Sequence, residues 1–357
     1  MGLYDSELYL EDIKKVADCK IPWDTFNGKT VAMSGATGLI GSFLIDVFMF
    51  KKSQGLDINI YGLGRNREKF YSRFSKWIGD SGLFYTPFEA SQPLVADNIG
   101  KADYVLHLAS NTHPIQYATD PIGTITTNII GLKTMLDFAV DHGAERFVFA
   151  SSNEIYGENR GDTELFDESY CGYIDSNTMR AGYPESKRCG EALCQAYMVQ
   201  KGLDVVVPRF TRSYGPTVLY DDSKAINQFI SNALKGEDII LKSAGTQNYS
   251  YTYMADAVSG LLYIIMSGES GMAYNIADET SNITLKELAR MIAGHVGRTV
   301  VFDIPDELEA SGYSKATKAL LDGSRLRDLG WRPLYDMQNG IERTLDIMTT
   351  MDQAFQV

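Results

Sequence analysis

The sequence predicts an α/β fold built on a doubly wound parallel sheet. Short apolar segments typical of buried strands alternate with helical patterns over the first two hundred residues. A glycine-rich turn at 35–41 separates the first such strand from the next helix. Strands that alternate with helices are joined by crossover connections, and these produce a parallel sheet with helices on both faces.

The size and charge of the chain narrow the classes of function. With 357 residues it can form one large domain, or a main domain with a smaller one. The formal net charge of −13 argues against nucleic-acid binding through a broad basic face, although a few local cations could bind an anionic ligand. No apolar run approaches the roughly 20 residues of a membrane helix, and the N-terminus lacks a signal-peptide pattern. We expect a cytoplasmic protein that binds neither membrane nor nucleic acid.

Cysteine and histidine residues do not indicate a metal site. The four cysteines are too few for a disulfide framework in so long a chain, and none belongs to a Cys-x-x-Cys pair. The four histidines show no ligand spacing. We therefore expect no bound metal and interpret the cysteines as small core residues.

The first part of the chain reads as an extension followed by a main domain. Residues 1–27 contain acidic and apolar positions at helical spacing, and we expect them to cover either the main domain or a neighbouring subunit. The main domain is expected over 28–210. Its predicted strands are 30–34, 58–63, 104–110, 146–151 and 204–208, and its predicted helices are 42–50, 121–140 and 183–200.

After residue 210 the pattern of the sequence changes. Residues 211–246 and 278–357 are expected to form a small substrate-binding domain, while 247–277 returns to the main domain. Thr284 and Glu287 have the spacing of a capping box. The predicted elements here are helices at 223–235, 255–266, 284–296, 326–329 and around 341–348, and a strand at 272–276.

The turn at 35–41 has the features of a dinucleotide-binding loop. Its glycines allow a tight turn, close approach of a diphosphate to backbone N–H groups, and close packing of helix on strand. A plain glycine-rich turn is the alternative, because the chain has 32 glycines. The candidate cofactor-binding residues are Gly35, Thr37, Gly38, Leu39, Ile40 and Gly41, with Leu108, Ala109 and Ser110 at the end of a later strand.

The end of the second strand bears on the choice of cofactor. An acidic residue there would bind the ribose hydroxyls of NAD. The strand is instead followed by Gly64 and Arg65, and this arginine could bind the 2′-phosphate of NADP. A solvated loop arginine is the alternative interpretation.

Tyr183 and Lys187 are candidates for acid–base catalysis. Residues four apart share one face of a helix, so the ammonium group could lower the pKa of the phenol by its charge. A nearby serine hydroxyl could complete a proton relay. In isolation such a pair more often belongs to a solvated helix face. Its occurrence after Ser152 and the glycine-rich turn favours the catalytic interpretation.

Together these motifs resemble the extended short-chain dehydrogenase/reductase family of NAD-dependent nucleotide-sugar epimerases, dehydratases and decarboxylases. The resemblance covers about residues 28–345 and is strongest to the UDP-glucuronate decarboxylases, through the stretch from Asp167 to Arg180. It implies a Rossmann-type domain with a small interleaved C-terminal substrate domain. The matching segments are Gly35–Gly41, His107–Ser110, Thr127-Asn128, Ser151–Gly157, Tyr183–Lys187, Arg209 with Tyr214–Pro216, and Leu329–Pro333.

The resemblance also implies a mechanism. Tyr183, with its pKa lowered by Lys187, would take the proton of the sugar C4 hydroxyl while hydride passes to the nicotinamide. Ser152 would hydrogen-bond the developing ketone, and Lys187 would also hold the nicotinamide ribose. The 4-keto sugar would then acidify neighbouring positions or lose a C5 carboxylate as CO2. By analogy, helices 121–140 and 183–201 would pair with a second subunit in a homodimer.

Two residues after Ser152 bear on the step that follows oxidation. Asn153 stands where dehydratases have an aspartic acid and decarboxylases a serine. Because an amide has no titratable proton, Asn153 cannot act as a general acid, and dehydration is disfavoured. Glu154 matches the glutamate of both groups and could serve as a base or orient water; a surface carboxylate is the alternative.

Three further positions concern substrate binding, together with Asn153. Tyr249 stands where the family usually has an arginine that binds the substrate diphosphate, and Arg212 stands where an asparagine near the sugar is usual. The positive charge could thus be relocated to Arg212. Lys224 matches a basic position on the nucleotide side. These differences leave a CDP- or dTDP-linked sugar open beside UDP-glucuronate.

We therefore predict an enzyme that oxidises C4 of a nucleotide sugar with bound NAD(P) and then decarboxylates or epimerises it. The alternatives are a 4-epimerase or 4,6-dehydratase on another nucleotide sugar, an NADP-dependent keto-sugar reductase, and a dinucleotide-binding sensor without catalysis. Internal recycling of hydride favours NAD, while Arg65 favours NADP. We expect NAD.

Overall fold

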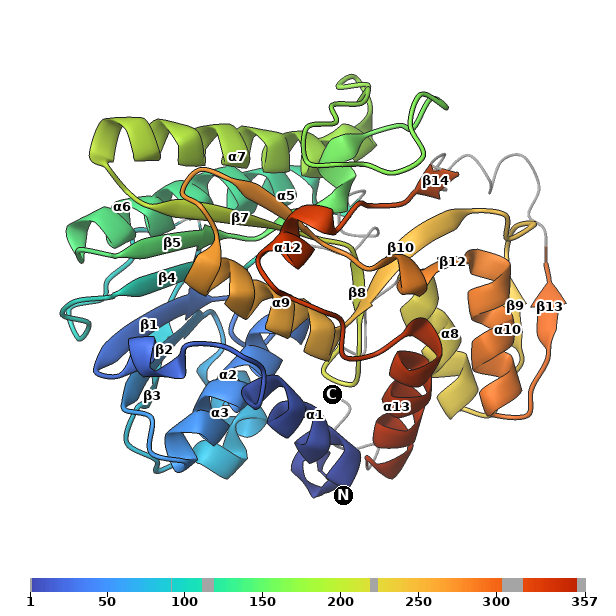
Figure 1. The fold of residues 1–357 in the computed structure, drawn as a ribbon, viewed down its shortest axis with the longest axis horizontal. Helices are drawn as coiled ribbons and strands as arrows, with labels where there is room; N and C mark the ends of the chain where they lie inside the picture. Colours follow the sequence, from blue (N-terminus) through green and yellow to red (C-terminus); the bar gives the residue numbers. More distant parts are fainter. Residues whose placement is uncertain (1, 91, 111–118, 219–223, 304–316, 352–357) are drawn as a thin grey trace.

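A parallel sheet forms the centre of the molecule (Figure 1). The computed structural model describes residues 2–90, 92–110, 119–218, 224–303 and 317–351. The strand order is β11-β7-β5-β4-β1-β2-β3, with β6 beside β7, and these strands pair in parallel. The strands are β1 (Lys29–Ser34), β2 (Ile58–Gly64), β3 (Leu83–Pro87), β4 (Tyr104–His107), β5 (Arg146–Phe149), β6 (Ser151–Ser152), β7 (Val205–Phe210) and β11 (Ala273–Ile276).

This strand order confirms the predicted doubly wound fold. The chain runs outward from β1 to β3 and then returns to β4 on the other side of β1. The winding therefore reverses between β1 and β4, and the crevice at such a point is where open α/β sheets bind ligands. The apolar strands are buried on both faces because helices cover each side.

Two layers of helices enclose the sheet (Figure 1). On one face α2 packs against α9, α1 lies over both, and α3 lies beside β2 and β3. On the other face α5, α6 and α7 form a layer in which α7 contacts both of the others. The helices are α1 (Glu7–Ala17), α2 (Leu39–Ser53), α3 (Arg67–Arg73), α5 (Pro121–Thr126), α6 (Leu132–Asp141), α7 (Gly182–Lys201) and α9 (Met254–Ser267).

A smaller unit follows directly from β7. Its sheet has the order β12-β10-β14, with β8 beside β10, and β9 pairs with β13. After β10 the chain returns to the main sheet through α9 and β11. The elements are β8 (Arg212–Tyr214), α8 (Ala225–Leu234), β9 (Ile239–Leu241), β10 (Asn248–Tyr253), β12 (Asn282–Thr284), α10 (Leu285–His295), β13 (Val300–Phe302), β14 (Lys318–Ala319), α12 (Ser324–Asp328) and α13 (Met337–Thr350).

Two of the predicted elements are interrupted. The helix predicted at 121–140 contains a π-helical turn, Thr127–Gly131, between α5 and α6. The strand predicted at 146–151 is divided at Ala150 into β5 and β6. Both interruptions lie beside the cavity described below, and π-helical turns are frequent at functional sites. The predicted capping box is confirmed by reciprocal hydrogen bonds between Thr284 and Glu287.

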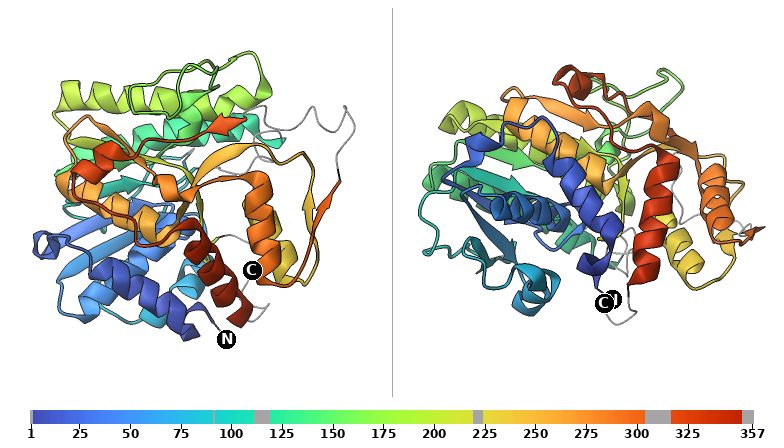
Figure 2. Two further views of the ribbon diagram at one scale, coloured as in Figure 1. Left: turned by 45° about the vertical axis from the view of Figure 1, so that its right-hand side comes forward. Right: turned by 60° about the horizontal axis from the view of Figure 1, so that its bottom comes forward.

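The N-terminal extension covers the main domain. Figure 2 shows α1 beside α13, and α1 also contacts α2 and α9. A fully buried carboxylate, Asp46 of α2, holds the extension against the main domain through hydrogen bonds. It accepts hydrogen bonds from Tyr4 at 2.7 Å, Tyr9 at 2.5 Å and Trp77 at 2.8 Å, and pairs with Arg73 at 2.6 Å.

A second buried carboxylate, Asp12 of α1, connects the extension to the end of the chain. It accepts hydrogen bonds from Tyr253 at 2.5 Å and Tyr335 at 2.6 Å, and pairs with Arg343 at 2.8 Å. Burial raises the pKa of Asp12, which these partners oppose. The extension is therefore part of the folded unit.

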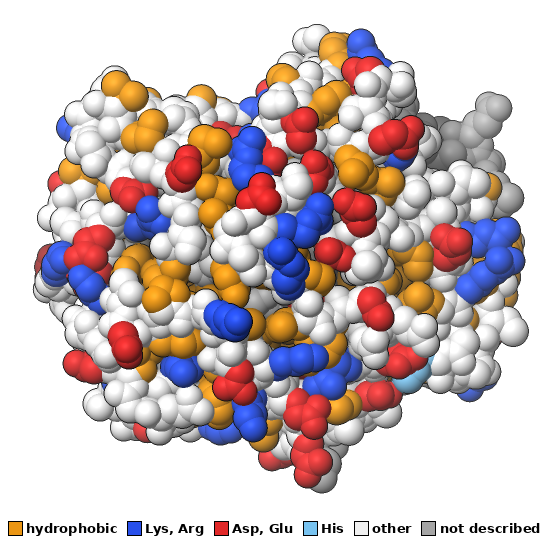
Figure 3. Space-filling view, viewed as in Figure 1, with side chains coloured by type: hydrophobic (Ala, Val, Ile, Leu, Met, Phe, Trp, Pro, Cys, Tyr) orange, Lys and Arg blue, Asp and Glu red, His pale blue; other side chains and the backbone are white. Residues whose placement is uncertain are grey.

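The molecular surface is of mixed charge. Acidic and basic side chains are interspersed over the face seen in Figure 3. Within the residues that the structure describes, the helices are too short or too polar to cross a bilayer.

Candidate functional site

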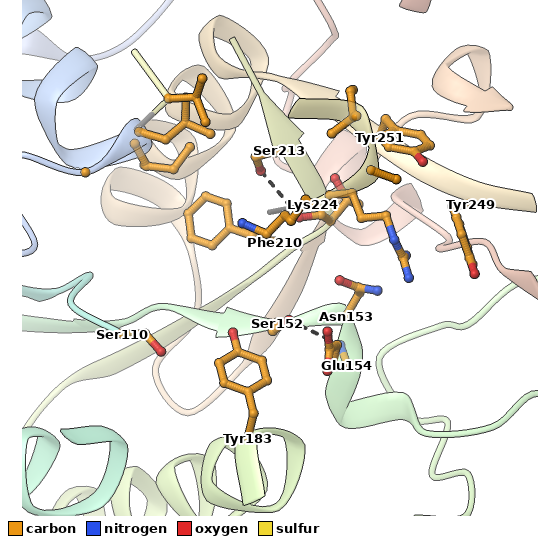
Figure 4. Close-up of a pocket in the computed structure, with 18 of the residues that line it drawn as sticks. Ser110, Ser152, Asn153, Glu154, Tyr183, Phe210, Ser213, Lys224, Tyr249 and Tyr251 are labelled. Carbon is orange, nitrogen blue, oxygen red and sulfur yellow. Dashed lines mark hydrogen bonds between the residues drawn. The ribbon is translucent and has the colours of Figure 1, made fainter. Parts of the chain in front are cut away.

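A cavity of about 540 Å³ lies where β1, β4 and β6 end and the smaller unit begins. It occupies the crevice at the carboxyl ends of the strands that the reversed winding predicts. Its lining comes from the glycine-rich turn, the end of β4, residues 150–154, α7, β8, β10 and α8. Figure 4 shows part of this cavity.

The glycine-rich turn forms one end of the cavity. Gly35 has φ +74°, and a Cβ atom there would lie 2.7 Å from the backbone nitrogen of Ala109. A Cβ atom at Gly41 would lie 2.4 Å from the carbonyl oxygen of Gly35. These close approaches bring the first turn of α2 against the strand ends, with its backbone N–H groups at the cavity. This cradle fits the diphosphate of a dinucleotide.

The predicted cofactor-binding residues are not all in the lining. Thr37, Ala109 and Arg65 lie outside it. Arg65 is exposed after β2, and the next residue, Asn66, caps α3 through a hydrogen bond from Lys69 N at 2.8 Å. The lining contains Gly35, Gly38, Leu39, Ile40, Gly41, Leu108, Ser110, Tyr183 and Lys187.

The first turns of α7 place Tyr183 and Lys187 on one face of the helix. Tyr183 is 5% exposed and points toward Ser152 and Ser110 (Figure 4). Lys187 is buried, and its Nζ donates a 2.7 Å hydrogen bond to the carbonyl oxygen of Ala150, where the strand is interrupted. The ammonium nitrogen lies 5.8 Å from the centre of the Tyr183 ring.

The charges at Tyr183 differ from the prediction. Burial raises the pKa of Tyr183, and the Glu154 carboxylate raises it further, while its hydrogen bonds with Ser152 and Ser110 lower it. Burial also lowers the pKa of Lys187 to about 7, although Glu191 opposes this shift. Lys187 is not among the groups that shift the pKa of Tyr183 here, and burial disfavours the charged form of both side chains.

A chain of hydrogen bonds that the sequence did not reveal supports this side of the site. Ser110 Oγ donates to Asn128 Oδ1 at 2.7 Å, and Asn128 Nδ2 donates to Ser186 Oγ at 2.9 Å. Ser186 Oγ in turn donates to the carbonyl oxygen of Tyr183 at 2.8 Å. The π-helical turn directs Asn128 inward, so it ties the end of β4 to α7 and positions Ser110 beside Tyr183.

The predicted substrate residues line the other half of the cavity. Asn153 and Glu154 follow Ser152 in a 3₁₀ turn, η5 (Asn153–Tyr156), where Glu154 N donates to Ser152 Oγ at 3.2 Å. Arg212 of β8 lies over Tyr249 of β10, with its guanidinium carbon 3.6 Å from the ring centre.

Several lining residues were missed by sequence reasoning. Lys224, which was predicted, stands at the N-cap position of α8 without a side-chain capping hydrogen bond. The apolar residues that follow it resemble the buried face of an ordinary amphipathic helix. Arg180 was noted only as part of a resemblance. Burial raises the pKa of Tyr249, and the charges of Arg212 and Arg180 oppose this shift. The further lining residues from the smaller unit include Ile226, Phe229, Ile240, Leu241, Lys242, Gln247, Tyr251 and Leu285.

Comparison with known proteins identifies the family. The model of the NAD dependent epimerase/dehydratase family matches residues 31–277. The chain belongs to this family. UDP-glucuronic acid decarboxylase 1 of Xenopus tropicalis is 30% identical over 319 residues, which are 89% of this chain and 71% of that protein. UDP-glucuronic acid decarboxylase 6 of Arabidopsis thaliana is 30% identical over 318 residues, 87% of this chain and 86% of that protein.

Solved structures of other family enzymes share the fold. The dTDP-glucose 4,6-dehydratase DesIV of Streptomyces venezuelae, with NAD bound, has a TM-score of 0.75 at 24% identity and covers 89% of this chain and 96% of its own. The UDP-glucuronic acid 4-epimerase of Bacillus cereus, with UDP-glucuronic acid and NAD, has a TM-score of 0.76 at 19% identity and covers 89% and 98%. The predicted family is therefore confirmed.

Proposed function

We propose that this protein oxidises C4 of a nucleotide sugar with bound NAD and then decarboxylates the 4-keto sugar acid, with UDP-glucuronate as the first candidate substrate. The main observation behind this proposal is that Tyr183 and Ser152 face each other in a cavity that the glycine-rich turn also lines. The two 30% identical decarboxylases support the choice of a sugar acid.

The chemistry follows from the protein side chains. Tyr183 takes the proton of the C4 hydroxyl, and the Ser152 hydroxyl stabilises the oxygen as the carbonyl forms. Lys187 would hold the nicotinamide ribose, and Gly35, Gly38 and Gly41 would accommodate the diphosphate. Bound NAD would supply a hydride acceptor that is regenerated within the cycle, so that no second substrate is consumed, and its nicotinamide cation would add a positive charge that lowers the phenol pKa.

The residues after Ser152 favour loss of CO2 over loss of water. Dehydration requires an acid for the leaving hydroxyl, and Asn153 has no titratable proton. In decarboxylation the bond between C5 and the carboxylate breaks, and its electron pair moves toward the C4 carbonyl as an enolate. Tyr183 and Ser152 can hydrogen-bond that enolate oxygen. C5 is then protonated, Glu154 being the titratable lining group beside Ser152, before hydride returns to C4.

NAD rather than NADP remains our proposal for the cofactor. Internal recycling needs no exchange with a cellular reductant, and the family model is that of NAD-dependent enzymes. Arg65, which suggested NADP, is exposed and outside the cavity lining.

The test is to incubate the purified protein with UDP-glucuronate and with UDP-, CDP- and dTDP-glucose, and to identify products and released cofactor by mass spectrometry. We expect CO2 and a nucleotide pentose from UDP-glucuronate, and NAD as the cofactor, recovered unreduced after turnover. An epimer of unchanged mass would instead support 4-epimerisation. Stoichiometric oxidation of NADPH, or no turnover of any sugar with cofactor bound, would contradict the proposal.

We also propose a homodimer formed through α5, the π-helical turn and α7. Their outer surfaces expose apolar side chains, including Ile122 and Val199, each 79% exposed, and Ile130 at 49%. Sedimentation equilibrium should give twice the chain mass, and Ile122→Asp should shift the equilibrium to monomer. A monomeric wild-type protein would refute this proposal.

The cytoplasmic location stays a prediction. The four cysteines are free thiols in the structure, which agrees with a reducing compartment.

A further inference from the structure

Arg212 is a partly buried cation that lacks an ion-pair partner among the described residues. Its Nη1 atom is inaccessible to solvent and has no hydrogen-bond partner among the described residues. No ion pair between described residues includes it. Other arginines with little exposure are each paired with a carboxylate: Arg73 with Asp46, Arg209 with Glu191, and Arg343 with Asp12.

The surroundings of Arg212 suit an anionic ligand. Its guanidinium carbon lies 3.6 Å from the centre of the Tyr249 ring, a contact that attracts the cation but gives Nη1 no hydrogen-bond acceptor. A guanidinium nitrogen that is shielded from water and has no acceptor is unfavourable, and phosphate or carboxylate oxygens are the preferred partners of arginine. In an acidic chain, this unpaired cation in the cavity indicates that a ligand supplies the missing charge.

The position of Arg212 indicates which part of the substrate it meets. Ser152 of β6 is opposite Phe210 of β7, and Arg212 follows Phe210 by two residues, roughly 7 Å along an extended chain. The same cavity is also lined by the start of α8 and by the apolar side chains of Phe229 and Ile240. Arg212 is therefore a short distance from the reaction end, in a cavity that continues to α8.

We infer that Arg212, held in plane by Tyr249, binds the diphosphate that joins sugar to nucleoside. This rests on the proposed function, since a sugar whose C4 lies at Ser152 and whose nucleoside lies at α8 places its diphosphate over Arg212. Tyr249 acts as a positioning residue: β10 and β8 are parallel neighbours, with Tyr251 opposite Arg212, so Tyr249 lies close enough to support the guanidinium.

The test measures binding of nucleoside diphosphates to the cofactor-loaded protein by calorimetry. UDP, CDP and dTDP are compared first, and the tightest is used with the variants. Arg212→Gln should weaken its binding about 30-fold, the range for a lost charge-assisted hydrogen bond. Arg212→Lys should lose about fivefold, because an ammonium keeps the charge but not the planar fork. Cofactor content and melting temperature report on folding.

Variants at Tyr249 separate the ring from its hydroxyl. Tyr249→Phe keeps the aromatic face and should bind within about twofold of wild type, whereas Tyr249→Leu should lose about fivefold. The double variant Arg212→Gln/Tyr249→Arg moves the guanidinium to the neighbouring strand. It should regain most of the nucleoside diphosphate affinity that Arg212→Gln loses. An exchange variant that binds no better than Arg212→Gln would count against the inference.

The ligands also separate the diphosphate from a sugar carboxylate. UDP, UDP-glucose and UDP-glucuronate should lose affinity for Arg212→Gln by the same factor. A loss confined to UDP-glucuronate would assign the guanidinium to the carboxylate and overturn the inference, as would unchanged binding of all three. Since these measurements need no turnover, failure of the proposed chemistry would leave them interpretable.

Discussion

Replacement of Tyr183 by phenylalanine should lower kcat by about 10³-fold while the protein keeps its cofactor. The ring is 5% exposed and packs in the first turn of α7, so phenylalanine preserves the packing and removes only the hydroxyl that faces Ser152. Single-turnover reduction of the bound cofactor by nucleotide sugar is the direct measurement. Tyr173→Phe, at a 47% exposed position outside the cavity, is the matched control and should remain within twofold of wild type.

The pH dependence gives this prediction a second readout. Because burial raises the pKa of Tyr183, the rate should rise with pH as the phenol ionises. The hydrogen bond from Ser152 lowers that pKa, so Ser152→Ala should move the rising limb to higher pH as well as slow the reaction. A Tyr183→Phe enzyme with normal cofactor reduction, or a Ser152→Ala limb displaced to lower pH, would refute the assigned roles.

Asp46→Ala should destabilise the protein by about 3–5 kcal/mol, because it leaves a buried cation unpaired. The carboxylate of Asp46 is fully buried and accepts hydrogen bonds from Arg73, Tyr4, Tyr9 and Trp77. Its removal leaves the guanidinium and three neutral donors without their acceptor, and it releases the N-terminal extension from α2. Urea unfolding followed by circular dichroism measures the loss.

An exposed aspartate provides the comparison for Asp46. Asp57 lies on the surface after α2, and Asp57→Ala should change the free energy of unfolding by no more than about 0.5 kcal/mol. Removal of residues 2–17 should reproduce much of the Asp46→Ala effect, since it takes away Tyr4 and Tyr9 as well as α1. A loss below about 1 kcal/mol for Asp46→Ala would show that the network is dispensable.

Local patterns in the sequence determined most of the elements and the central motif of the site. In the glycine-rich turn, backbone atoms come so close to Gly35 and Gly41 that a side chain would not fit, and the sequence shows this requirement directly as glycine. The spacing of Tyr183 and Lys187 likewise follows from helix geometry alone. The family was therefore predictable before the fold was known. The N-terminal extension was recognised, but not what it covers, because Asp46 and Asp12 find their partners far away in the sequence.

Only the tertiary structure shows the pKa shifts at the site and which residues line the substrate end of the cavity. Desolvation depends on everything packed around a group, so no local pattern could show that burial raises the pKa of Tyr183 and lowers that of Lys187. Phe229 and Ile226 look like core residues in sequence because one apolar stripe serves both helix packing and the lining of the cavity. The sequence alone predicted which chemistry the chain begins, through the spacing of Tyr183 and Lys187 after Ser152. Only the fold placed Arg212 over Tyr249, because β8 pairs with β10 although the two strands lie far apart in the sequence.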